Sequence, residues 1–171
     1  TVVLENEPVT GIPVTAGRVA GVETGRRSIR APVVVDAAGG WVRQVAGQAG
    51  AQVPVATVRH QLLITAPSPA VDPGDAIVRV VDAAVYLRPA RGGLMVGGFE
   101  PEPLPVDPQH QHGSFSTDNL PLDLGVLLHL AEQVTAEVPA AGGGPVAEHR
   151  GGLFTMSPDG RFVAGPVPDR P

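Results

Sequence analysis

The residues of this chain best suited to acid–base chemistry are a histidine and a tyrosine in separate β-type runs. His60 lies in the run from Thr57 to Ala66, and Tyr86 lies in the run from Val85 to Pro89. A neutral imidazole can take or share a proton near neutral pH, and a phenol hydroxyl can orient a substrate as donor or acceptor. Arg88, two positions further on, could bind a carboxylate through a bidentate pair.

Each of these side chains also has a purely structural alternative. A histidine that stands alone on a sheet is usually solvated or hydrogen-bonded within the fold. An arginine on a strand usually forms an exposed or structural salt bridge. The residue types alone therefore leave the roles of His60, Tyr86 and Arg88 open.

A second stretch with chemical potential is Val33-Val34-Val35-Asp36-Ala37-Ala38-Gly39-Gly40. Its continuous β-branched run is typical of a parallel strand buried on both faces, and residues 41–50 predict a short helix after it. A strand, a turn of small residues and a helix form a nucleotide-binding crevice, where backbone and helix N-terminus approach a pyrophosphate. The alternative is that Ala37, Ala38 and Gly39 merely let the strand and helix pack closely.

Other kinds of chemistry are excluded or weakly supported. The chain has no cysteine, which excludes disulfides and thiol catalysis, and no G-x-S-x-G signature occurs. His110-x-His112, with Asp107 and Asp118 nearby, is too sparse a pattern to predict a metal site, and we expect none. The net charge of −5 argues against a nucleic-acid partner. No apolar run reaches the roughly 20 residues that span a bilayer and no signal peptide is evident, so we expect a cytoplasmic protein without a membrane partner.

The elements that would position these residues are mostly short strands separated by glycine and proline turns. The clearest helix is expected over residues 121–138, where apolar residues recur at helical spacing behind Asp123. A long loop is expected over residues 100–119. Strands are expected at residues 1–4, 9–14, 18–23, 28–30, 57–66, 76–81, 85–89, 93–99 and 146–155, with tight turns at 15–17, 90–92 and 157–160 and a last short strand ending at 164. The predicted fold class is α+β, with a mostly antiparallel sheet and flanking helices.

Four segments of the chain carry a family resemblance. They are Gly17-Arg18-Val19-Ala20-Gly21-Val22 with Val33 to Trp41; Pro54 with Val58-Arg59-His60-Gln61; Tyr86-Leu87-Arg88-Pro89 with Gly92 to Glu100; and Gly151-Gly152-Leu153 with Ser157-Pro158-Asp159-Gly160 and Gly165-Pro166-Val167-Pro168. In this order they resemble the D-amino-acid oxidase-like family of FAD enzymes, which includes sarcosine, glycine and dimethylglycine oxidases. Phe154 stands where the glycine-oxidase-like branch has an arginine, so the resemblance is closest to the dimethylglycine and sarcosine dehydrogenase-like branch.

The resemblance implies an FAD-dependent oxidoreductase that oxidises a secondary or tertiary amine of the N-methylglycine type by hydride transfer to flavin. It implies that His60 and Tyr86 are catalytic residues of the substrate pocket. Arg88, which the resemblance does not assign, stays the candidate for binding a substrate carboxylate because of its guanidinium. The residues it places against the FAD are Ala37, Ala38, Gly39 and Trp41. The alternative is a catalytically silent relative that keeps the fold as a regulatory or binding subunit.

Two parts of the family pattern are absent: the G-x-G-x-x-G dinucleotide motif and the glycine-rich C-terminal segment that closes over the flavin. We therefore expect residues 1–50 to be part of an FAD-binding domain and residues 51–171 to be a substrate-binding α+β domain. The missing N- and C-terminal parts of the protein would be the partners of this segment, which by itself would be inactive and hold no flavin tightly. We also expect exposed apolar surface around residues 33–41, which a homodimer could cover.

Overall fold

The computed structural model describes residues 1–108 and 115–167, and these fall into two compact units. Of the described residues, 1–57, 107–108 and 155–167 form the first unit, and 58–106 and 115–154 form the second. None of the helices in the described part of the chain has the length and apolarity needed to cross a membrane. His110 and His112, the weak metal pattern, lie outside the described residues.

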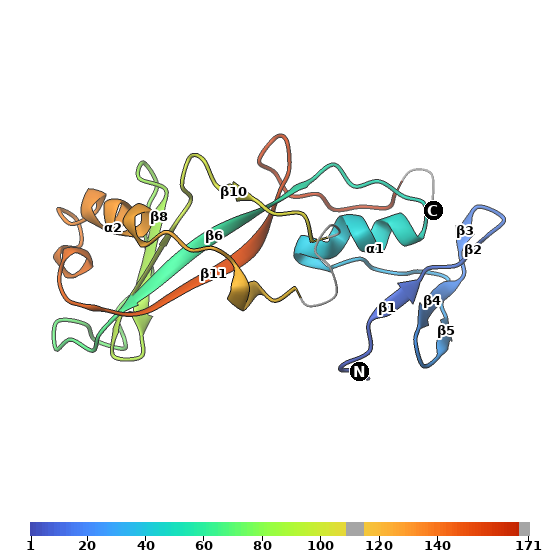
Figure 1. The fold of residues 1–171 in the computed structure, drawn as a ribbon, viewed down its shortest axis with the longest axis horizontal. Coiled ribbons are helices and arrows are strands. Elements are labelled where there is room, and N and C mark those ends of the chain that lie inside the picture. Colours follow the sequence, from blue (N-terminus) through green and yellow to red (C-terminus); the bar gives the residue numbers. More distant parts are fainter. Residues whose placement is uncertain (109–114, 168–171) are drawn as a thin grey trace. The chain divides into compact units, whose positions relative to one another are not determined.

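The first unit contains two small antiparallel sheets and a helix (Figure 1). One sheet has the order β1-β4-β5 and the other pairs β2 with β3. The strands are β1 (Val9–Gly11), β2 (Val14–Thr15), β3 (Arg18–Val19), β4 (Gly21–Thr24) and β5 (Ser28–Arg30). Ala16 and Gly17 join β2 to β3 with φ angles of 50° and 79°, the left-handed geometry of a tight hairpin turn, as predicted. The predicted helix also forms, as the 3-10 turn η1 (Gly39–Trp41) followed by α1 (Val42–Gln48).

The prediction of a parallel strand in the segment from Val33 to Gly40 is wrong. Residues 31–38 form no strand, and Val33 and Val35 are 72% and 82% exposed. A buried parallel strand needs a neighbour to complete its hydrogen bonds, and none of the described strands pairs with this segment. The predicted exposure of apolar surface is confirmed for these two valines.

Two further strand predictions are wrong, again because the predicted segments have no described strand to pair with. Residues 1–4 are irregular, and no strand follows the turn at residues 157–160. The turn itself forms, with the Gly160 backbone N donating to Ser157 O at 3.2 Å. Phe162, just beyond the turn, is fully exposed. Neither residues 1–4 nor the residues after the turn pair with a described strand, so their strand propensity does not produce a strand.

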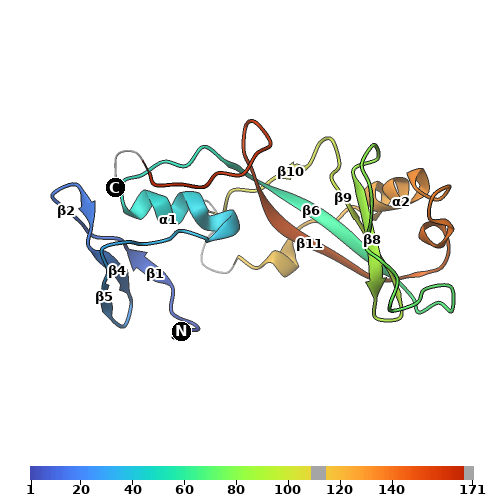
Figure 2. The same ribbon diagram turned by 180° about the vertical axis from the view of Figure 1, so that it is seen from behind.

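The second unit is built on a six-stranded sheet (Figures 1 and 2). Its order is β10-β6-β9-β8-β7, and β11 also pairs with β6. The strands are β6 (Ala56–Thr65), β7 (Val78–Val80), β8 (Val85–Ala90), β9 (Gly93–Gly98), β10 (Leu104–Pro105) and β11 (Val146–Met156). The predicted hairpin joins β8 to β9, with Arg91 and Gly92 at φ angles of 55° and 79°. The pairs β10–β6, β6–β9, β8–β9 and β7–β8 are antiparallel, which confirms the predicted α+β class with a mostly antiparallel sheet.

The predicted core helix forms as α2 (Leu124–Gln133), which is shorter than the range expected from its apolar spacing. The carboxylate of Asp123 caps it by accepting from the backbone N of Gly125 and Val126 at 2.9 and 3.4 Å. The 3-10 turn η4 (Pro139–Gly142) follows it. Within the expected loop over residues 100–119 the structure places β10 and the 3-10 turn η3 (Thr117–Asn119).

Candidate functional site

One face of the large sheet is covered by α2. Successive residues of a strand point to opposite faces, and residues paired across antiparallel strands share a face. Leu63, Val96 and Leu87 are paired across β6, β9 and β8. They pack with Leu127 and Leu130 of α2 into the hydrophobic core. This core fixes which residues of the three strands face the other way.

The opposite face carries the residues predicted to form the site. Gly97 of β9 pairs with Leu62 of β6 and with Tyr86 of β8. His60 stands two residues before Leu62, and Arg88 stands two residues after Tyr86, so strand alternation places them on the same face. The register therefore brings His60, Tyr86 and Arg88 to one side of the sheet, away from α2.

His60 is 3% exposed and is enclosed by two aromatic rings and a carboxylate. Its ring centroid lies 4.9 Å from that of Phe99 and 5.1 Å from that of Phe154, both in edge-to-face geometry. Its Nδ1 lies 2.5 Å from Oε2 of Glu100. Its Nε2 is buried and has no hydrogen-bond partner among the described residues. Because leaving a buried polar atom unpaired costs free energy, this nitrogen is a candidate contact for a ligand.

The carboxylate of Glu100 is shared between His60 and Arg59. Its Oε1 lies 3.5 Å from Nη2 of Arg59, and both side chains are buried. Nη1 of Arg59 also donates to the backbone O of Pro121. A guanidinium stays charged in proteins, so it balances the charge of this buried carboxylate. No role was expected for Glu100 or Arg59 from the sequence, although both lie inside the segments that carry the family resemblance.

Tyr86 is half-buried above Gly97. A Cβ at position 97 would lie 2.3 Å from Cζ of Tyr86, so the ring occupies the space over the glycine. Its centroid is 6.2 Å from that of Phe99. Burial raises the pKa of Tyr86 above its ordinary 10.0, the charge of Glu100 adds to this increase, and the charge of Arg88 opposes it. At neutral pH the hydroxyl is therefore a hydrogen-bond donor and acceptor, not a phenolate.

Arg88 presents its guanidinium to solvent on the same face. Nη1 donates to the backbone O of Pro89 at 3.3 Å. Arg88 forms no ion pair among the residues that the structure describes, which does not favour the structural salt bridge considered above. Its donors remain able to bind an anion.

The predicted flavin contacts lie in the first unit. The Ala38 backbone N donates to Asp36 Oδ1 at 3.1 Å, and the Trp41 backbone N donates to Ala38 O at 3.0 Å, which forms a tight turn. Burial raises the pKa of the Asp36 carboxyl, and the hydrogen bond from Ala38 opposes this. Gly39 has a φ of 54° and no atom within 4 Å of its Cβ position, and Ala37 is exposed. This open backbone fits close approach by a dinucleotide.

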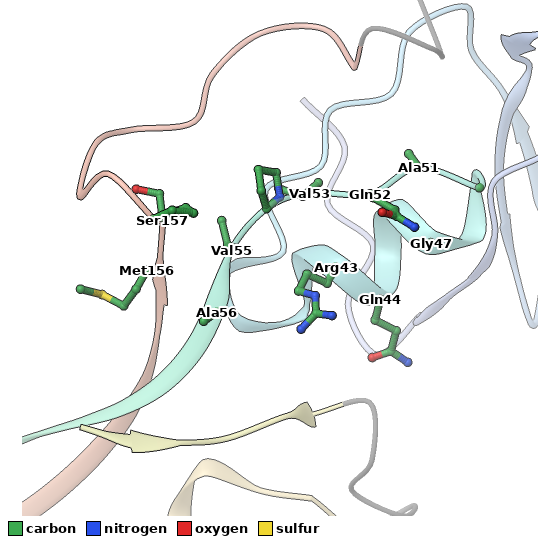
Figure 3. A pocket seen from close by; sticks show the side chains of 13 residues that line it. Arg43, Gln44, Gly47, Ala51, Gln52, Val53, Val55, Ala56, Met156 and Ser157 are labelled. Carbon is green, nitrogen blue, oxygen red and sulfur yellow. The ribbon is translucent and has the colours of Figure 1, made fainter. Parts of the chain in front are cut away.

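A hollow of about 1220 Å³ also lies in the first unit (Figure 3). Figure 3 shows its lining side chains coming from α1, from the segment that follows α1, and from the end of β11. None of the predicted site residues lines it. Within residues 1–108 and 115–167, no group of three or more metal-binding side chains could hold a metal ion.

Comparison with known proteins identifies relatives along the whole chain. The family described as FAD dependent oxidoreductase (DAO) matches residues 1–171. Mitochondrial sarcosine dehydrogenase of Homo sapiens is 34% identical over 175 residues, which cover 98% of this chain and 18% of that protein. Mitochondrial dimethylglycine dehydrogenase of Rattus norvegicus is 29% identical over 167 residues, which cover 93% of this chain and 20% of that protein.

A solved structure shows the same fold. The crystal structure of L-proline dehydrogenase from P. horikoshii is similar to the chain with a TM-score of 0.74 and 21% identity, over 97% of this chain and 42% of that chain. The chain thus corresponds to 18% and 20% of the two curated relatives. Since the family match extends over every residue of the sequence, the chain belongs to the FAD-dependent oxidoreductase (DAO) family.

Proposed function

We propose that this chain is the central segment of an FAD-dependent oxidoreductase that oxidises a secondary or tertiary amine of the N-methylglycine type. The observation that carries the proposal is the buried His60, whose Nε2 has no partner among the described residues and which shares a sheet face with Tyr86. The similarity to proteins named sarcosine dehydrogenase and dimethylglycine dehydrogenase supports this substrate class.

The side chains of this face suit the protein's part in such a reaction. Removing a hydride from the carbon beside an amine requires a free lone pair on nitrogen, so a substrate ammonium must first lose a proton. His60 Nε2 is the acceptor we propose for that proton, and the Tyr86 hydroxyl orients the amine. The exposed guanidinium of Arg88 binds the substrate carboxylate. When bound, the flavin supplies the hydride acceptor.

We further propose that residues 1–50 belong to the flavin-binding domain and residues 51–171 to the substrate-binding domain. The open backbone and small side chains of the turn after Asp36 support flavin contacts by Ala37, Ala38, Gly39 and Trp41. The exposed Val33 and Val35 support a covering partner for this segment, either the rest of its own protein or a second copy. A segment that lacks that partner is expected to hold FAD weakly and to be inactive.

The cytoplasmic location stays a prediction, and both named relatives are mitochondrial.

The test is to purify the full-length protein and to record its visible spectrum. We expect flavin absorbance that bleaches without oxygen when sarcosine or dimethylglycine is added. Trimethylglycine is the matched control, because its quaternary nitrogen has no lone pair and it cannot be oxidised in this way. His60→Ala should slow bleaching by about 10²- to 10⁴-fold. His129→Ala, which changes an exposed histidine on α2, should leave the rate unchanged.

Two outcomes would contradict the proposal. A pure, folded and colourless full-length protein would contradict flavin dependence. A protein that binds flavin tightly but is bleached by neither amine would contradict the substrate class. That second result would favour the catalytically silent regulatory or binding relative.

A further inference from the structure

We propose that Glu100 is a positioning residue for His60, holding the imidazole in the tautomer that carries its proton on Nδ1 and leaves Nε2 as an acceptor. This inference rests on the proposed function, because it concerns the proton acceptor of that reaction. The tautomer itself can be measured without any activity, so the two proposals can fail separately.

The proposed position of the proton is inferred from the short contact between the two side chains. His60 Nδ1 lies 2.5 Å from Glu100 Oε2. An ionised carboxylate offers only acceptors, so the hydrogen in this contact belongs to Nδ1. A neutral imidazole carries a single N–H, and its other nitrogen must then hold a lone pair. The free lone pair therefore lies on Nε2, the nitrogen that lacks a partner among the described residues.

Arg59 holds the carboxylate of Glu100 in the orientation that this contact requires. Its Nη2 lies 3.5 Å from Glu100 Oε1, the oxygen that His60 does not use. The contact of Nη1 with the backbone O of Pro121 fixes the guanidinium from a second side. A buried carboxylate without such a cation would be costly to keep ionised. The two oxygens of Glu100 thus have separate partners. The carboxylate cannot rotate away from His60 without also losing its contact with Arg59.

The aromatic rings prevent His60 from reaching the alternative arrangement easily. Phe99 and Phe154 meet the imidazole at interplanar angles of 72° and 89°, and their own centroids are 5.8 Å apart. Turning the ring over would move Nδ1 away from Glu100 and would have to displace these edge-to-face contacts. The orientation of the ring and the location of its proton are therefore set together.

The first test measures the tautomer. Nitrogen NMR of isotope-labelled histidine in the full-length protein distinguishes protonated from unprotonated ring nitrogens, and His60→Ala assigns the signals. At a pH where the imidazole is neutral, we expect Nδ1 protonated and Nε2 unprotonated. Glu100→Gln retains an acceptor oxygen and should keep this tautomer, whereas Glu100→Ala should produce the form protonated on Nε2.

The matched control is Glu102→Ala, which removes an exposed carboxylate two positions away and should leave the tautomer unchanged. A wild-type His60 protonated on Nε2 would overturn the inference. Because this result comes from the wild-type protein, the inference can be tested even if Glu100→Ala does not fold. A folded Glu100→Ala variant that keeps the wild-type tautomer would overturn it as well.

The second test asks whether Glu100 acts through His60. The rate constant for flavin bleaching by the amine should fall on the order of 10- to 100-fold in Glu100→Ala, the size of loss seen when a carboxylate that orients a metal-binding histidine is removed. The double variant with His60→Ala should be no slower than His60→Ala alone. Losses that multiply in the double variant would overturn the positioning role. If no amine bleaches even the wild-type flavin, the proposed function fails. The tautomer measurement still tests whether Glu100 positions the His60 ring, because it does not depend on activity.

Discussion

Gly97 of β9 lies directly opposite Tyr86 of β8, and the phenol ring fills the space where a side chain at position 97 would stand. A Cβ there would lie 2.3 Å from Cζ and 2.4 Å from the hydroxyl oxygen of Tyr86. Nonbonded atoms do not approach this closely, so either the ring or the backbone would have to move. The position of the tyrosine ring, and hence of its hydroxyl, depends on a glycine that has no chemistry of its own.

Replacing Gly97 by alanine should therefore displace the Tyr86 ring or spread the two strands. We expect a loss of about 1–3 kcal/mol in the free energy of unfolding, measured with denaturant, because overpacking forces side chains or backbone to move. Amine oxidation by the full-length protein should slow as well. Gly143→Ala is the matched control in the same unit, since Gly143 has an ordinary φ of −122° and no atom within 4 Å of its Cβ position. Its effect should stay within about 0.5 kcal/mol, and an equally small effect at Gly97 would contradict the packing argument.

The elements that can be predicted from the sequence are those determined by local chemistry. The hairpin between β8 and β9 follows from Arg91-Gly92, which accept the left-handed turn. The core helix follows from its apolar period and from Asp123, which caps it. The segment from Val33 to Gly40 has the composition of a buried strand, but a strand exists only with a partner, and the described residues provide none.

The candidate site is predictable only in part for the same physical reason. His60, Tyr86 and Arg88 can be placed on strands from the sequence, but their common face depends on the register that sets Gly97 against both Leu62 and Tyr86. The contact between Glu100 and His60 joins residues 40 positions apart. No local pattern specifies such a pair, because the path of the chain beyond β9 decides it.

The hydroxyl of Tyr86 should lose its proton only above the ordinary pH of a phenol. Burial raises its pKa above 10.0, Glu100 raises it further, and Arg88 lowers it. Arg88→Gln should therefore move the titration midpoint to higher pH, and Glu100→Gln should move it to lower pH. Phenolate absorbance, taken as the difference between each protein and the same protein with Tyr86→Phe, measures the midpoint.

Arg150→Gln is the control for the loss of a positive charge, because the Arg150 side chain is exposed and its charge is paired with Glu148. It should leave the midpoint where it is. A midpoint at or below 10.0 in the wild type, or a downward movement in Arg88→Gln, would show that the ring is not buried beside these charges.

His149 should make the second unit less stable in mild acid. Burial lowers its pKa below 6.5, the charge of Arg59 lowers it further, and Asp123 opposes both. The unfolded chain then binds the proton more readily than the folded chain, so the free energy of unfolding falls as the pH decreases through about 6.5. His149→Gln should flatten this dependence in denaturant unfolding at a series of pH values. His129→Gln, which changes an exposed histidine of α2, should retain the wild-type slope, and an unchanged slope in His149→Gln would refute the assignment.

Asp123 has two separable effects, one on helix α2 and one on His149. Its side chain caps the helix, and its backbone N donates to Gln61 Oε1, which also lies 3.1 Å from His149 Nε2. Asp123→Ala should cost about 1 kcal/mol in the free energy of unfolding, while Asp123→Asn should retain most of the stability because asparagine caps equally well. Both variants remove the negative charge that raises the pKa of His149, so NMR titration should find that pKa lower still in each. Unequal effects on the titration, or equal losses of stability, would show that capping and charge are not separate at this position.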